Sequence, residues 1–274
     1  MSLQLKIVAV LGSLAILISQ ISNLNSARAD YQTAYRDYVY NYSVYKNAHN
    51  DYQIAKSSYQ TYHTLTSQNE AVARFKTVLK ARDNVISAYY DLLQEKLSST
   101  EGISPDTKST FGTISQSEKA YLTSHQKRVD DASTLSDLNA VSQEFESRYG
   151  QISLETKQAI GNVLLTKEAN LKIRLDALVS DLTRKTEEIR QSGEDTGILD
   201  RGLIAANNKL DFYEKQYAAA KLTFSGVKQD RFSQTVPTIN VFAGQQSLAQ
   251  ANQYLRETMT ILKEAVRSIT GGQI

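Results

Sequence analysis

Residues 30–66 read DYQTAYRDYVYNYSVYKNAHNDYQIAKSSYQTYHTLT, and tyrosine recurs in this stretch at every seventh position. Seven residues span two turns of an α-helix, so the recurring side chains share one face. Alanine stands three residues after most of these tyrosines, and a further tyrosine stands four residues after two of them. These residues widen the face to a stripe about 100° across. The tyrosines of the stripe are Tyr31, Tyr38, Tyr45, Tyr52 and Tyr59, with Tyr35 and Tyr42 at its edge. The stretch therefore predicts one long amphipathic helix.

The rest of the chain also favours an all-α fold. Its 274 residues are 41% apolar, which is enough to bury a substantial core. Only two prolines interrupt it, and runs of β-branched residues long enough for strands are few. Capping patterns predict helix starts at Ser67 with Glu70, at Ser104-Pro105, and at Thr134 with Asp137. The predicted helices cover residues 30–65, 67–99, 104–131, 135–191, 199–227 and 241–269.

The lengths and apolar faces of these helices predict two elongated helical bundles in tandem, spectrin-like in outline, with coiled-coil-like heptad packing. Residues 30–135 form the N-terminal bundle, which has three helices, or four if the early part of the long helix completes it. Residues 136–274 form a C-terminal three-helix bundle, joined to the first by that long bridging helix. Gly150 and Gly161 fall within the long helix, where they predict a kink or a break.

Residues 1–29 have the layout of a secretory signal peptide. A lysine near the start precedes an apolar run at 7–18, and a polar stretch ends in Ala-Arg-Ala at 27–29, before the predicted cleavage site. The apolar run is about a dozen residues, short of the ~20 that span a bilayer, which favours cleavage. The alternative is an uncleaved membrane anchor, because an apolar segment extended to 3–21 is marginally long enough. Both interpretations predict that residues 30–274 lie outside the cytoplasm.

The sequence offers little catalytic or metal-binding chemistry. Cysteine is absent, which excludes disulfides and thiolate chemistry. His49 and His63 are about 21 Å apart along one helix and cannot share a metal ion. His125 lies on the apolar face of its helix, where a lone histidine is more often packed or exposed at the edge than catalytic. No glycine-rich phosphate loop is present either. We therefore expect no enzyme activity, no cofactor, no metal site and no catalytic residues.

The charges of the chain argue against nucleic acid as a partner. The formal net charge is only +2, and basic and acidic residues alternate along the helices. Such mixing is typical of solvated helix faces. A stripe of basic residues interleaved with aromatic residues, which would neutralise a row of phosphates, is missing.

The tyrosine-rich helix, the Thr-Leu-Thr-Ser-Gln sequence at 64–68, and Ser-Asp-Leu at 136–138 with Phe145 resemble a group of known sequences. They are similar to uncharacterised secreted or membrane-anchored helical proteins of candidate phyla radiation bacteria. The resemblance covers residues 1–200. It implies an extracytoplasmic helical bundle of unknown role, and it identifies no site residues.

The tyrosine-rich face of residues 31–59 has two interpretations. One is core packing within the bundle. The other is a face for a protein partner or for self-association, because tyrosine provides a large, stiff contact area with a polar tip. The sequence thus favours a structural or protein-interaction role at the cell envelope. Alternatives are a helical sensor or ligand-binding domain, with a cavity lined by tyrosine hydroxyls, and a helical pore-forming toxin.

Overall fold

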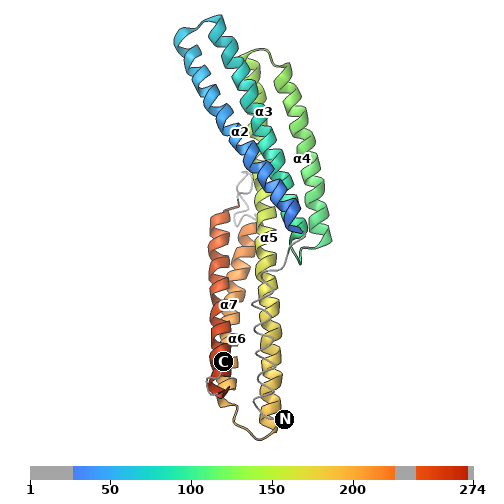
Figure 1. Cartoon of the computed structure of the whole chain (residues 1–274), viewed down its shortest axis with the longest axis vertical. Coiled ribbons are helices and arrows are strands. Elements are labelled where there is room, and N and C mark those ends of the chain that lie inside the picture. Colours follow the sequence, from blue (N-terminus) through green and yellow to red (C-terminus); the bar gives the residue numbers. More distant parts are fainter. Residues whose placement is uncertain (1–26, 226–238, 271–274) are drawn as a thin grey trace, which may run out of the picture. The chain divides into compact units, whose positions relative to one another are not determined.

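The computed structural model describes residues 27–225 and 239–270. Within these ranges the chain is helical and contains no strand, so the all-α prediction is confirmed (Figure 1). The helices are α2 (Ala27–Tyr62), α3 (Leu65–Ser99), α4 (Pro105–Asp131), α5 (Leu135–Gln191), α6 (Gly197–Ser225) and α7 (Val241–Thr270). The predicted signal peptide or anchor falls almost wholly on residues 1–26, outside the described residues. No helix in the described part combines the length and the apolar run needed to cross a bilayer.

Side-chain caps set where α4 and α5 begin. Ser104 caps α4, its hydroxyl accepting a hydrogen bond from the Thr107 amide at 3.1 Å, and Pro105 takes the first helical position. At α5 the Thr134 hydroxyl accepts from the Asp137 amide at 3.1 Å, and the Asp137 carboxylate accepts from the Thr134 amide at 2.9 Å. Both predicted starts are confirmed. These contacts satisfy amide groups that have no partner within the helix.

The predicted start of α3 is wrong by one helical turn. The cap is Thr64, whose hydroxyl accepts from the Ser67 amide at 3.1 Å, while the Ser67 hydroxyl accepts from the Thr64 amide at 3.2 Å. Ser67 is therefore the third residue of the helix rather than its cap. The reason is the turn itself, because His63 adopts a left-handed conformation with φ of 50° and reverses the chain within two residues.

The helix α5 runs without interruption from Leu135 to Gln191, so the break expected at Gly150 and Gly161 does not occur. Each glycine weakens a helix by about 0.5–1 kcal/mol relative to alanine. Burial of Ile152 and Ala159 between the two glycines offsets this cost by removing apolar surface from water.

Packing divides the described chain into two compact units. The N-terminal unit contains α2, α3, α4 and the part of α5 up to residue 163. Within it α2 lies alongside α3, and α3 lies alongside α4 (Figure 1). One core cluster joins α2, α3, α4 and the start of α5, and a second joins α3, α4 and α5 farther along. Their buried members include Ala48, Phe75, Leu79, Val129 and Leu138 in the first, and Tyr90, Leu97, Phe111, Phe145 and Ile152 in the second.

The C-terminal unit contains α5 from residue 164, α6 and α7. Its core is mainly leucine and alanine at helical spacing, including Leu175, Leu182, Leu203, Leu210, Leu255 and Leu262. The division between the units therefore falls within α5, between residues 163 and 164. From the sequence we placed it between 135 and 136, at the start of this helix. The difference arises because Phe145 and Ile152 pack with α3 and α4, so the early part of α5 belongs to the N-terminal unit.

Glycine allows α6 and α7 to approach closely. A Cβ atom on Gly202 would lie 2.6 Å from the Cβ of Ala265, well inside van der Waals contact. A Cβ atom on Gly244 would lie 2.5 Å from the ring of Phe224. The Cβ of Ala265 is fixed to the backbone and the ring of Phe224 is buried, so a side chain at Gly202 or Gly244 requires one of these neighbours to shift.

We predict opposite effects for two glycine-to-alanine substitutions. Gly202→Ala should lower the free energy of unfolding by about 1–3 kcal/mol, because overpacking at Ala265 outweighs the gain in helix propensity. Gly112→Ala in α4 meets only the Gln94 side-chain amide at 3.7 Å. It should raise the free energy of unfolding by up to about 1 kcal/mol. Urea unfolding followed by circular dichroism measures both, and equal effects of the two substitutions would contradict the close approach of α6 and α7.

Candidate functional site

The seven tyrosines of the predicted interaction face occupy two different environments. Those of the seven-residue row, namely Tyr31, Tyr38, Tyr45, Tyr52 and Tyr59, are partly buried. The two at the edge, Tyr35 and Tyr42, are 50% and 51% exposed. The predicted interaction face therefore combines a row of tyrosines that packs within the protein with a neighbouring pair of exposed tyrosines.

The packed row faces α3. The ring of Tyr52 stacks on Phe75 with centroids 4.5 Å apart, and the ring of Tyr38 lies 5.3 Å from that of Tyr89. Burial raises the pKa of both Tyr38 and Tyr52. Ala48 and Ala55, three residues after Tyr45 and Tyr52, are buried. Large rings and small alanines thus share the contact with α3, as the sequence predicts for core packing.

The exposed pair belongs to a second stripe on α2. Tyr35, Val39 and Tyr42 are spaced at i, i+4 and i+7, which places them on one side of the helix. Val39 is 44% exposed. The rings of Tyr35 and Tyr42 stack on those of Tyr31 and Tyr38, with centroids 6.4 and 6.3 Å apart. We call Tyr35, Val39 and Tyr42 the tyrosine stripe.

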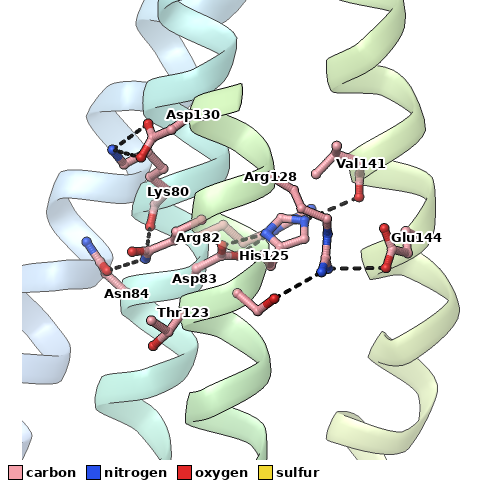
Figure 2. A network of polar contacts seen from close by, with 12 residues as sticks. Lys80, Arg82, Asp83, Asn84, Thr123, His125, Arg128, Asp130, Val141 and Glu144 are labelled. Atoms are coloured by element: carbon pink, nitrogen blue, oxygen red, sulfur yellow. Dashed lines mark hydrogen bonds and ion pairs between the residues drawn. The ribbon is translucent and has the colours of Figure 1, made fainter. Parts of the chain in front are cut away.

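A buried histidine–carboxylate pair lies in the N-terminal unit. His125 of α4 and Asp83 of α3 are both 0% exposed, and the histidine Nδ1 lies 2.6 Å from an Asp83 carboxylate oxygen. The histidine Nε2 lies 3.2 Å from the backbone carbonyl of Val141 in α5. Figure 2 shows these three groups converging from three helices. Both ring nitrogens face oxygen atoms. Either the imidazole carries both N–H donors, or it donates from Nε2 to Val141 while a protonated Asp83 carboxyl donates to Nδ1.

Arg82 brings a cation to the same interior. Its guanidinium stacks over the ring of Phe145, 3.6 Å from the centroid, and its Nε lies 3.7 Å from the second Asp83 oxygen. Burial lowers the pKa of Arg82, and the charge of Asp83 opposes this shift. The arginine thus helps to balance the carboxylate without a well-formed hydrogen bond to it.

A second buried polar layer links the same helices. The Glu118 carboxylate of α4 is buried and receives two bonds from the guanidinium of Arg148 in α5. The hydroxyl of Tyr90 in α3 donates to Glu155 at 2.8 Å. Burial and this hydrogen bond raise the pKa of Tyr90. Together with His125 and Asp83, these contacts tie α3, α4 and α5 together at two levels.

These buried groups are arranged for structure rather than for reaction with a substrate. His125 and Asp83 are closed off from solvent, so no substrate reaches them in this conformation. Within residues 27–225 and 239–270, no three histidine or acidic side chains are placed to hold a metal ion. His125 is packed, as expected. His49 and His63 both lie on the exposed side of the first helical hairpin.

Sequence reasoning missed the acidic partners. Asp83 lies four residues after Leu79 and seven before Tyr90, so it occupies the apolar face of α3. Glu118 lies four residues before the buried Leu122, so it occupies the apolar face of α4. The sequence signal for such a residue is an acidic side chain at a position where the helical spacing otherwise places apolar residues. The identity of its partner depends on which helices become neighbours, and a single sequence does not encode that in its local pattern.

The C-terminal unit contains a groove of about 680 Å³ between α5 and α7. Leu164 and Leu248 contribute apolar surface, and Lys167, Glu168 and Arg256 contribute charge. Tyrosine hydroxyls, which we expected in a ligand cavity, do not line it. Glu168 lies four residues after Leu164 and seven before Leu175, so it also occupies an apolar register.

We predict that His125 and Asp83 are strongly coupled. Removing either partner leaves the other buried without its hydrogen bond, so Asp83→Ala and His125→Ala should each cost about 3–5 kcal/mol of unfolding free energy. The double variant should cost less than the sum of the two, by about 0.5–3 kcal/mol. Urea unfolding of all three variants measures this coupling.

The exposed pair of Asp91 and Lys119, 2.7 Å apart, provides the control. Asp91→Ala should cost less than about 1 kcal/mol, because water solvates the lysine that remains. Additive losses for His125 and Asp83 would contradict their direct contact.

Comparison of the chain with family models, curated proteins and solved structures finds no match.

Proposed function

We propose that this protein is a non-enzymatic, extracytoplasmic helical-bundle protein with a structural or protein-interaction role at the cell envelope. The observation that carries the proposal is the exposed tyrosine stripe on α2. An exposed aromatic row at helical spacing is the form in which helices present anchors to a partner. Tyrosine and other aromatic residues are enriched at protein interfaces for the same reason.

The proposed architecture is two consecutive helical bundles with heptad packing. Its support is the buried series Leu199, Leu203, Ala206, Leu210 and Tyr213 in α6, which alternates by three and four residues. In coiled coils this alternation keeps one seam facing the neighbouring helix.

The partner that best fits the tyrosine stripe is a second copy of this chain. Arg36 and Asp37, the charged residues nearest in sequence, point about 100° and 200° away from Tyr35 around the helix. On this side of α2 the positions from Tyr35 to Tyr42 are uncharged, and the next residue on the same side is Lys46, four residues after Tyr42. Two copies can therefore meet at the stripe itself without repulsion between like charges. A two-fold pairing brings the same patch of each copy together, which suits an apolar patch flanked by polar side chains.

The proposed location depends on the N-terminal sequence. Residues 1–29 have the signal-peptide layout, with an uncleaved anchor as the alternative. The resemblance of the tyrosine-rich helix to secreted helical proteins of candidate phyla radiation bacteria supports the same location. The proposed contacts of the chain are thus a protein partner or a second copy, and a membrane if residues 1–29 remain attached.

A ligand-binding domain is the second candidate, and the groove between α5 and α7 favours it. A pore-forming toxin is third. It would need an apolar hairpin that inserts into a membrane, and helices of that kind do not occur in the described ranges.

We predict that the tyrosine stripe drives self-association. Tyr35→Ala with Tyr42→Ala should weaken the dimer of the full chain by at least about tenfold, because both anchors are lost. The control is Tyr40→Ala with Tyr62→Ala, two exposed tyrosines that lie on other sides of α2. Sedimentation equilibrium measures the dissociation constants. A monomeric wild-type chain, or equal weakening by the control, would rule out this surface.

We predict that the bulk of the protein is recovered outside the cytoplasm after cell fractionation. Mass spectrometry of the natural N-terminus should give Asp30 as the first residue of a released protein. An anchored protein would instead begin at Met1 and stay with the membrane fraction. Recovery of the bulk in the cytoplasm would refute the proposed location.

A further inference from the structure

The groove between α5 and α7 contains a buried carboxylate with incomplete partners. Glu168 is only 8% exposed, and burial raises its pKa. Its two oxygens accept hydrogen bonds from the amide nitrogen of Asn252 alone, at 3.4 and 3.3 Å. Charge-assisted bonds are normally about 2.7–2.9 Å long, so these are weak. Among the described residues, no lysine or arginine forms an ion pair with Glu168.

Two cations border the same groove. Lys167 and Arg256 are exposed, and both contribute to the lining. Neither forms an ion pair with an acidic side chain in the described part of the chain. Arg256 is close enough for its charge to favour the ionised form of Glu168. The groove thus has a negative group at its base and positive groups at its edge.

This charge pattern discriminates between classes of ligand. A simple amine would pair with Glu168 but would be repelled by Lys167 and Arg256. A simple carboxylate would pair with the two cations but would be repelled by Glu168. A molecule that carries both charges satisfies all three groups. Leu164 and Leu248 offer apolar surface for a short aliphatic chain. The volume of about 680 Å³ lies within the range of small-molecule sites.

We propose that the groove between α5 and α7 binds a small aliphatic zwitterion, with its ammonium group on Glu168 and its carboxylate on Lys167 and Arg256. This site is independent of the tyrosine stripe, since the groove and the stripe belong to different units. The proposal therefore adds a ligand to the protein without relying on self-association.

Isothermal titration calorimetry of the full chain tests the proposal with three probes of similar shape. L-leucine carries both charges, 3-methylbutylamine lacks the carboxylate, and 4-methylpentanoate lacks the ammonium group. Leucine should bind, and each singly charged probe should bind at least about tenfold more weakly, because one charged contact is lost. Absence of saturable leucine binding would overturn the proposal, and so would equal binding of all three probes.

Two variants assign the contacts. Glu168→Gln should remove the preference for leucine over 4-methylpentanoate, and Arg256→Met should reduce the preference for leucine over 3-methylbutylamine. Glu257→Gln is the matched control, because Glu257 follows Arg256 directly but pairs with Lys209 at 2.6 Å. It should leave all three affinities unchanged, and unchanged thermal unfolding shows that the variants are folded. Loss of leucine binding in the control, or retained selectivity in Glu168→Gln, would refute the assigned contacts.

Discussion

A buried ionisable group must find a partner, and this requirement constrains the N-terminal unit more tightly than its apolar contacts do. Apolar burial is non-directional, whereas His125 needs the Asp83 carboxylate and the Val141 carbonyl at defined positions. Farther along the helices, the hydrogen bond between Glu118 of α4 and Arg148 of α5 also requires its two partners at defined positions. A shift of one residue between α3, α4 and α5 would break both sets. These contacts therefore fix the register of the three helices.

The helix α2, the first that the structure describes, lacks a buried ionisable group of this kind, and its packing differs accordingly. It packs on α3 through alternating tyrosine rings and alanines, which leaves the rings only partly buried. A ring with a hydroxyl tip tolerates this position because one end can remain hydrated. The same property allows Tyr35 and Tyr42 to lie at the surface with their hydroxyl groups hydrated. A packed row of rings and an exposed aromatic stripe thus lie on adjacent sides of one helix, which is the basis of the proposed interaction role.

The core of the C-terminal unit consists mainly of leucine and alanine, and glycine allows its helices to approach closely. Gly202 lets α6 approach Ala265 of α7, and leucines fill the centre. Glu168 is an exception within this apolar pattern, because its carboxylate is buried beside a groove and, among the residues that the structure describes, has only Asn252 as a hydrogen-bond partner. In the N-terminal unit the buried carboxylates have close histidine or arginine partners. That contrast is the reason for proposing a ligand at Glu168 and a structural role for Asp83.

The sequence by itself determined the all-α fold, most helix boundaries, and the tyrosine row, because helical periodicity and the caps at Ser104 and Thr134 are local properties. It also placed His125 on the apolar side of its helix, where the structure buries it. It failed at Thr64, where the conformation of His63 moved the cap, and at α5, where burial outweighed two glycines. Only the tertiary structure decided that Asp83 meets His125, that Tyr35 and Tyr42 stay exposed, and that Glu168 borders a groove. Each of these depends on which helices become neighbours, and distances between helices are not contained in the period of one of them.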